Sequence, residues 1–134
     1  MEDLALKVRI SVLWFLMAVA MSAHSVLYFL EPDAIAMIES GDFWMGMDPT
    51  GMMLFMALFW LVPLWMGFLS VTLNGSTNRW TNIILGIIFT ILNIWHLTEH
   101  VATASVHQIL IIGSTVVATA LITWYAYKWS KQEA

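Results

Sequence analysis

Four long apolar runs dominate the sequence and restrict what the chain can fold into. They cover about residues 10–30, 51–73, 81–100 and 107–127. A helix that crosses a membrane needs about 20 apolar residues, so each run has the length of one span. Only 10% of the 134 residues are charged, against roughly 25% in soluble domains. The sequence therefore predicts an all-α, polytopic membrane protein with a single four-helix transmembrane domain over residues 1–134.

The basic residues predict the orientation of these spans. Every Lys and Arg lies before the first run, between the second and third, or after the fourth: Lys7, Arg9, Arg79, Lys128 and Lys131. With four spans these segments share one side, and basic loops stay in the cytoplasm. We therefore expect an up-down-up-down bundle in the cytoplasmic membrane, with both termini cytoplasmic.

The connection after the first run is expected on the outer side. It carries acidic residues and no basic one: Glu31, Asp33, Glu39, Asp42 and Asp48. Pro32 near its start and Gly41 further on predict a short helix from Pro32 to Ser40. Apolar residues within this helix predict that it rests on the membrane surface.

One face of the third span is polar. Its members are spaced by 4, 3, 4, 3 and 4 residues, which places them on one helical face: Asn82, Gly86, Phe89, Asn93, His96 and His100. Polar groups are costly in lipid, so this face is expected to point into protein or water. Asn82, Asn93 and Glu99 form a candidate polar stripe. It can serve helix packing or line the path of a small transporter or channel.

All four histidines fall in the outer half of the predicted bundle: His24, His96, His100 and His107. A rise of about 1.5 Å per residue puts His24 and His96 at one depth on different helices. They are therefore candidate axial ligands of a haem, and all four are candidate ligands of a transition metal. The alternative is that these histidines are packed side chains and ordinary polar helix ends.

Methionines gather near the outer end of the second span: Met45, Met47, Met52, Met53 and Met56. Thioether and imidazole groups together suit Cu(I), although methionine is also a common apolar filler.

Catalytic signatures are almost absent from the sequence. His96 to His100 reads H-x-x-E-H, a pattern of some zinc peptidases, but a four-span chain of this length leaves little room for a third ligand and a substrate cleft. The chain has no cysteine, which excludes thiolate metal sites and disulfides. Five basic residues give no nucleic-acid surface. We predict no catalytic residue and lean against an enzyme.

Four stretches carry a family resemblance: SVLWFL, VPLWMGFLSVTL, NRWTNIILGIIFT and LITWYAYKW. In this order they resemble a domain-of-unknown-function family of small four-helix membrane proteins from prokaryotes, distantly similar to the DoxX-like group. The resemblance implies four membrane helices with both termini inside, and no activity. At the inner face, Arg79 and Trp80 are a candidate contact site for a partner or for lipid.

Three functions follow from these patterns. The first is a small non-enzymatic membrane protein, acting as an accessory subunit of a membrane complex or as a homo-oligomer, in contact with the lipid bilayer. The alternative is a redox or metal-handling protein that binds haem, copper or zinc at the outer face. The third is a small transporter or channel.

Overall fold

The computed structural model describes residues 2–43, 46–103 and 105–129, and these residues form helices connected by short loops. The helices are α1 (Glu2–Tyr28), α2 (Pro32–Ser40), α3 (Pro49–Thr72), α4 (Gly75–Ala102) and α5 (Val106–Lys128). All except α2 are long and apolar enough to cross a membrane, by length and composition. The predicted all-helical class with four long apolar helices is confirmed.

The helix ends differ from the ends of the apolar runs. Helix α1 begins at Glu2 and α4 at Gly75, ahead of the predicted residues 10 and 81. An apolar run marks only lipid-compatible residues, whereas helical hydrogen bonding continues into polar segments. Helix α2 has its predicted bounds. It ends at Gly41, whose φ of 71° is left-handed, a conformation that glycine adopts without steric cost.

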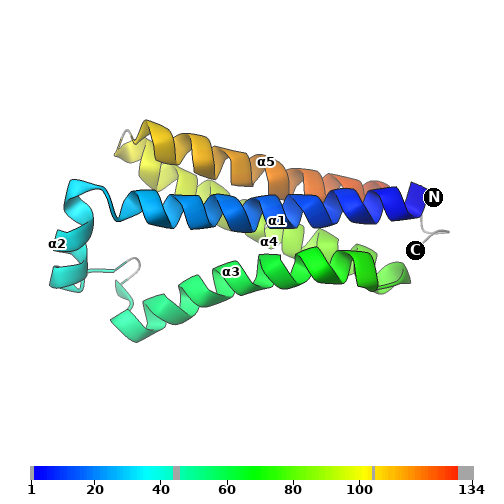
Figure 1. Ribbon diagram of the computed structural model, residues 1–134, viewed down its shortest axis with the longest axis horizontal. Helices are drawn as coiled ribbons and strands as arrows, with labels where there is room; N and C mark the ends of the chain where they lie inside the picture. Colours follow the sequence, from blue (N-terminus) through cyan, green and yellow to red (C-terminus); the bar gives the residue numbers. More distant parts are fainter. Residues whose placement is uncertain (1, 44–45, 104, 130–134) are drawn as a thin grey trace.

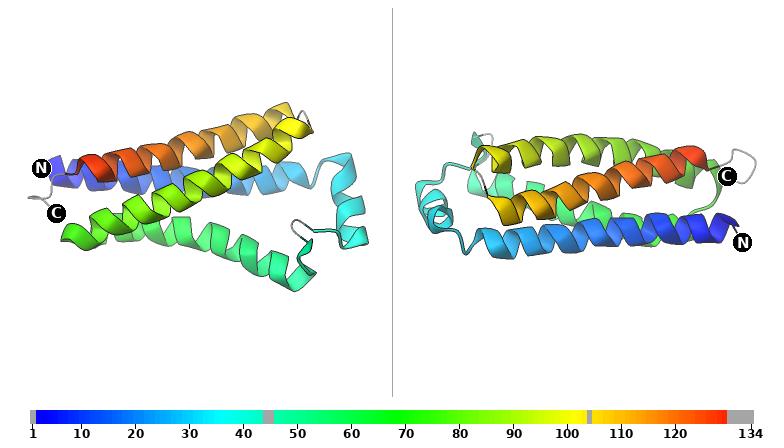
Figure 2. Two further views of the ribbon diagram at one scale, coloured as in Figure 1. Left: turned by 180° about the vertical axis from the view of Figure 1, so that it is seen from behind. Right: turned by 90° about the horizontal axis from the view of Figure 1, so that it is seen from above.

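The start of α1 and the end of α5 lie together at one end of the molecule, and α2 lies at the other (Figure 1); these are called here the terminal end and the α2 end. Helix α5 packs extensively against both α1 and α4, whereas α3 packs on α1 and barely touches α4. Further views show α3 diverging from the other long helices towards the α2 end (Figure 2). Pro63 lies inside α3 and removes one helical hydrogen bond there.

The apolar core is formed mainly by α1 and α5 and is completed by Met66 of α3 and by Ile83 and Phe89 of α4. Ile10, Trp14 and Met17 of α1 are fully buried, as are Ile122 and Ala126 of α5. Trp129 is also buried, because it closes this core after α5. The aromatic residues at the terminal end that remain exposed include Trp124 and Tyr127.

Helices α4 and α5 approach each other closely at Gly86. A Cβ atom at this position would collide with the hydroxyl oxygen of Thr123 on α5. Small residues permit such approach between apolar helices, so Gly86 sets the distance between these two helices.

A buried hydrogen-bond network joins three helices towards the terminal end. The Asn82 Oδ1 oxygen accepts from Trp14 Nε1 at 2.7 Å and from Ser70 Oγ at 3.0 Å. Asn82 in turn donates to the side chain of Asn78 at 2.7 Å, and Asn78 donates to the Ser70 carbonyl at 2.9 Å. These bonds fix α3 to α1 and α4 at the end where the helices converge.

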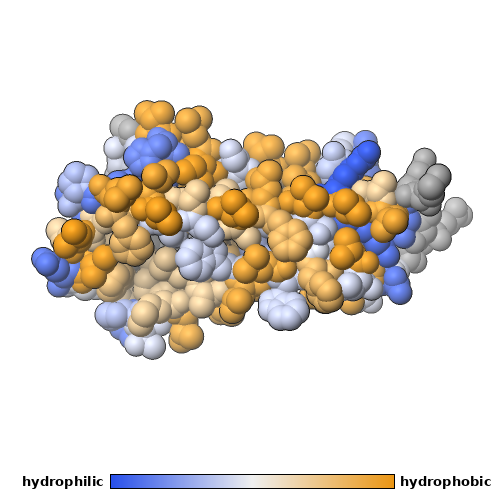
Figure 3. Space-filling model, in the orientation of Figure 1, coloured by the Kyte–Doolittle hydropathy of each residue, from blue (hydrophilic) through white to orange (hydrophobic). Residues whose placement is uncertain are grey.

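The sides of the molecule are apolar, and the polar side chains in this view gather mainly at its two ends (Figure 3). Large apolar side chains on the long helices are mostly exposed, among them Val19, Leu58, Leu110 and Val117. An apolar surface of this extent is unusual for a soluble monomer, and it is consistent with contact with a lipid bilayer.

Candidate metal centre

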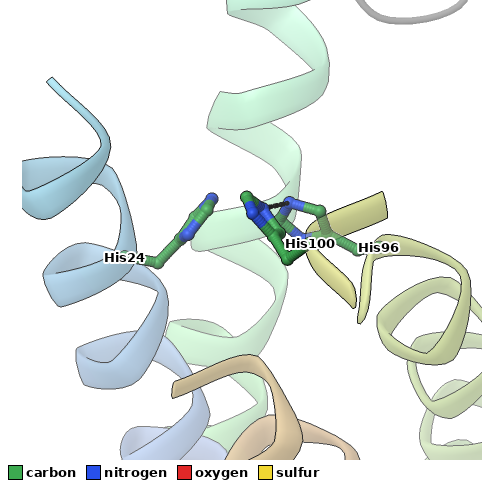
Figure 4. A group of neighbouring side chains, drawn as sticks. All are labelled: His24, His96 and His100. Carbon is green, nitrogen blue, oxygen red and sulfur yellow. Dashed lines mark hydrogen bonds between the residues drawn. The ribbon is translucent and has the colours of Figure 1, made fainter. Parts of the chain in front are cut away.

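Three histidines from two helices converge near the α2 end. His24 lies on α1, and His96 and His100 lie one turn apart on α4 (Figure 4). One ring nitrogen of each lies within 4.8 Å of the others. His24 and His100 are buried and His96 is half-buried. This part of the predicted polar face of α4 does point into the protein. His100, for which an ordinary solvent-exposed helix end was the alternative, is buried.

The nitrogen spacing within this cluster resembles that of ligands on one ion. The Nε2 atoms of His96 and His100 lie 3.2 Å apart. Two ligands about 2.0–2.1 Å from a tetrahedral ion are about 3.3 Å apart. The same distance fits a hydrogen bond between two neutral imidazoles. The distance between the two nitrogens is therefore compatible with one shared proton and with one shared metal ion.

The ring arrangement fits a single ion better than a haem. The centroids of His24 and His96 lie 4.7 Å apart with the rings nearly perpendicular, and those of His24 and His100 lie 5.1 Å apart. Two imidazoles on opposite sides of a haem iron, each bonded at about 2 Å, have centroids about 6 Å apart with the macrocycle between them. In this cluster the His100 ring lies close to both His24 and His96, where a haem macrocycle would need space.

Gln108 fixes the orientation of the His24 ring. Its Oε1 oxygen lies 2.6 Å from His24 Nδ1, while its Nε2 donates to Glu31 at 3.2 Å. An amide oxygen only accepts, so Nδ1 carries the proton and Nε2 keeps its lone pair for an ion. Metal-binding histidines commonly donate their other N–H in this way. Gln108 was not among the residues predicted from the sequence. Its amide in the first turn of an otherwise apolar run is a pattern that could have indicated a buried polar partner.

His107 stands apart from the cluster. Its Nε2 lies 3.0 Å from Glu31 Oε1, an oxygen that also accepts from Ser105 Oγ at 3.2 Å. Partial burial alone raises the pKa of the Glu31 carboxyl, but hydrogen bonds from Gln108, His107 and Ser105 outweigh it and hold that pKa below its ordinary value. Of the four predicted ligands, the structure thus brings together three and assigns His107 to a contact that joins the α1–α2 connection to α5.

A cavity of about 990 Å³ opens beside the histidines at the α2 end, between α1, α2, α3 and α4. His24, His96 and His100 all line it, and so does Glu99. Glu99 is not among the side chains whose ligand atoms converge. The H-x-x-E-H segment supplies two of the converging histidines, and His24 of α1 supplies the third. The cluster is accessible from this cavity.

The two predicted stripe asparagines have separate environments. Asn82 is engaged in the network with Trp14 and Ser70. The amide of Asn93 is fully buried, and neither of its polar atoms has a partner among the described residues. Neither asparagine lines the cavity, so the stripe does not continue the histidine cluster.

The two members of the predicted contact pair at the terminal end differ in exposure, although the Arg79 guanidinium lies over the Trp80 ring, 5.2 Å from its centroid. Arg79 is buried, and its Nη2 donates to the Tyr127 carbonyl of α5 at 3.3 Å. Carbonyls at a helix C-terminus attract cationic side chains, which explains why Arg79 turns inward. Trp80 is half-exposed and remains on the surface.

Comparison with known proteins gives no relative: no family model, no curated protein and no solved structure matches this chain. The resemblance to small four-helix membrane proteins therefore remains a prediction from the four quoted stretches, and a function has to be argued from the histidine cluster and its surroundings.

Proposed function

We propose that this chain is an integral membrane protein that binds a transition-metal ion at His24, His96 and His100 and serves to handle that metal. The convergence of three imidazole nitrogens within 4.8 Å carries the proposal. Imidazole suits zinc, copper, iron and nickel and is a poor ligand for magnesium or calcium. The Gln108 contact supports it further, because it leaves the Nε2 lone pair of His24 available.

In this proposal the four long helices cross the cytoplasmic membrane in an up-down-up-down order. The basic residues Lys7, Arg9, Arg79 and Lys128 belong to the segments at the terminal end, which would then be cytoplasmic; Lys131 lies outside the described residues. The metal site and the acidic α2 end would face the other side. Exposed Ile35 and Ile38 on α2 suit a helix lying at the membrane surface.

The site resembles an exchange site more than a closed structural one. Structural zinc sites take four ligands from the protein, whereas sites that act on a ligand keep one position open. Here three protein nitrogens converge and the cavity adjoins them. A fourth ligand can therefore arrive from the cavity and leave by it.

Metal content of the purified protein tests this proposal. Loaded with Zn²⁺ or a copper ion in detergent and then desalted, the wild type should retain about one ion per chain, and His24→Ala, His96→Ala and His100→Ala should each lose most of it. His107→Ala is the matched control and should retain the ion. Absence of bound metal in the wild type, or equal loss in His107→Ala, would overturn the proposal.

The other predicted roles differ in their support. An accessory subunit or a small homo-oligomer stays a prediction, and either is compatible with a metal site. A channel or transporter along the α4 stripe has less support, because Asn82 is held by hydrogen bonds and Asn93 does not line the cavity.

A further inference from the structure

Methionine side chains line the same cavity as the three histidines. They come from three helices: Met21 on α1, Met37 on α2, and Met52, Met53 and Met56 on α3. The chain contains no cysteine, so these thioethers are the sulfur donors at this site. Of the other methionines singled out in the sequence, Met47 does not line the cavity, and Met45 lies outside the described residues.

One of these sulfur atoms has a defined contact, and the other methionines are placed by their helices. Met52 and Met56 are four residues apart, on one face of α3, and both are half-buried. Met37 Sδ accepts a hydrogen bond from the Tyr28 hydroxyl at 3.1 Å, which holds that side chain against α1. Met21 is buried on α1, three residues before His24. The cavity therefore combines imidazoles from α1 and α4 with thioethers from α1, α2 and α3.

This donor set discriminates between metal ions. Thioethers are soft ligands that select Cu(I), whereas imidazole accepts several ions. Both groups are neutral, and the cost of removing an ion from water rises steeply with its charge. A monovalent ion therefore suits converging donors that carry no charge of their own. The carboxylates that line the cavity, Glu31, Asp33, Asp42 and Glu99, lie outside the converging group and can attract cations to its mouth.

We infer that the ion handled by this protein is Cu(I), and that at least one of the cavity methionines Met37, Met52 and Met56 binds it together with His24, His96 and His100. This inference rests on the proposed metal site and names its ion. The competing explanation is that the methionines only fill space with flexible apolar side chains.

Exchange of methionine for leucine separates the two explanations. Leucine has nearly the volume of methionine, and such swaps preserve core packing, but it offers no sulfur. The triple variant Met37→Leu/Met52→Leu/Met56→Leu removes three cavity thioethers. Met66→Leu is the matched control. Met66 lies on α3 with Met52 and Met56, is buried, and does not line the cavity.

Binding of Ag⁺, a soft monovalent ion that does not change oxidation state under these conditions, should be compared with binding of Zn²⁺. We expect the triple variant to lose affinity for Ag⁺ by about tenfold or more, with Zn²⁺ affinity changed by less than about twofold. Met66→Leu should match the wild type for both ions. If the triple variant unfolds in detergent, the single variants Met37→Leu, Met52→Leu and Met56→Leu are measured in the same way. At least one of them should lose Ag⁺ affinity, and three single variants that all match the wild type would overturn the assignment.

NMR of methyl-labelled methionine gives a direct readout of sulfur ligation. Addition of Ag⁺ should shift the methyl signal of at least one of Met37, Met52 and Met56 and leave that of Met66 in place. Two failures are distinguishable. If the wild type binds neither ion, the proposed metal site is wrong. If Zn²⁺ binding depends on the histidines but Ag⁺ affinity and the cavity methyl signals are indifferent to the methionines, only the assignment to Cu(I) is wrong.

Discussion

The Nδ1 atom of His24, on the first helix, lies 2.6 Å from the Oε1 atom of Gln108, on the last long helix. Gln108 is completely buried, and its amide nitrogen is oriented by Glu31 at 3.2 Å. One side chain that binds no metal itself therefore determines which His24 nitrogen faces the other two histidines.

Replacing Gln108 by leucine should weaken metal binding without removing a ligand. Loss of such a hydrogen-bond partner typically lowers metal affinity by about 10–100-fold, because the imidazole loses its preferred tautomer and orientation. Competition with a chelator of known zinc affinity measures this loss, and a Gln108→Leu protein that binds as tightly as the wild type would contradict the assigned role.

Glu31 should make the stability of the protein dependent on pH on the acid side. Its folded pKa lies below the ordinary value of 4.5, so the ionised form is favoured in the folded state. The stabilisation is therefore present above about pH 4.5 and is lost as the pH falls through the folded pKa. Thermal unfolding of wild type and Glu31→Gln should differ near pH 5.5 and converge towards pH 3. A difference that persists at the lowest pH would show that the carboxylate charge is not its source.

Asn82 and Asn93 lie on the same face of α4, yet their replacement by leucine should have opposite consequences. Asn82→Leu leaves the Trp14 and Ser70 donors without their acceptor, which costs about 1–3 kcal/mol. Asn93 has no partner among the described residues, so Asn93→Leu should be neutral or stabilising. Unfolding midpoints in detergent check the pair, and equal destabilisation would indicate that Asn93 does have a partner in solution.

Gly86→Ala should separate α4 from α5. The added Cβ atom meets the Thr123 hydroxyl, and a helix displaced in a packed bundle loses contacts along its length. Gly113→Ala is the control, because a Cβ atom there meets nothing within 4 Å. That variant should stabilise α5 by about 0.5–1 kcal/mol. Thermal unfolding should therefore show a lower midpoint for Gly86→Ala and a higher midpoint for Gly113→Ala than for the wild type. Equal destabilisation of the two variants would refute the packing argument.

Apolar run length and turn residues predicted the elements well. Four long helices and α2 follow from patterns that are local in sequence, and counting along a helix placed His24 and His96 at one depth. The structure adds the direction in which each side chain points around its helix axis. His100 points inward beside His96, whereas His107 points towards Glu31.

The missing parts of the site depend on which helices are neighbours. Residues 24 and 108 meet because α1 packs on α5, and no local pattern in the sequence reports that pairing. The cavity likewise arises because α3 diverges from α4 between the Asn82 network and the α2 end (Figure 2). This divergence depends on the packing of the whole bundle. Residue types suggested a chemistry, but their partners were decided by packing between distant segments.

The position of α5 between α1 and α4 also sets an order of events during synthesis. His24 is synthesised early, His96 and His100 follow much later, and α5, which packs against both α1 and α4, comes after them. The complete cluster can therefore exist only after α5 has been synthesised and packed. Any ion that uses all three histidines must be acquired after that point, so loading depends on the supply of metal where the assembled bundle resides.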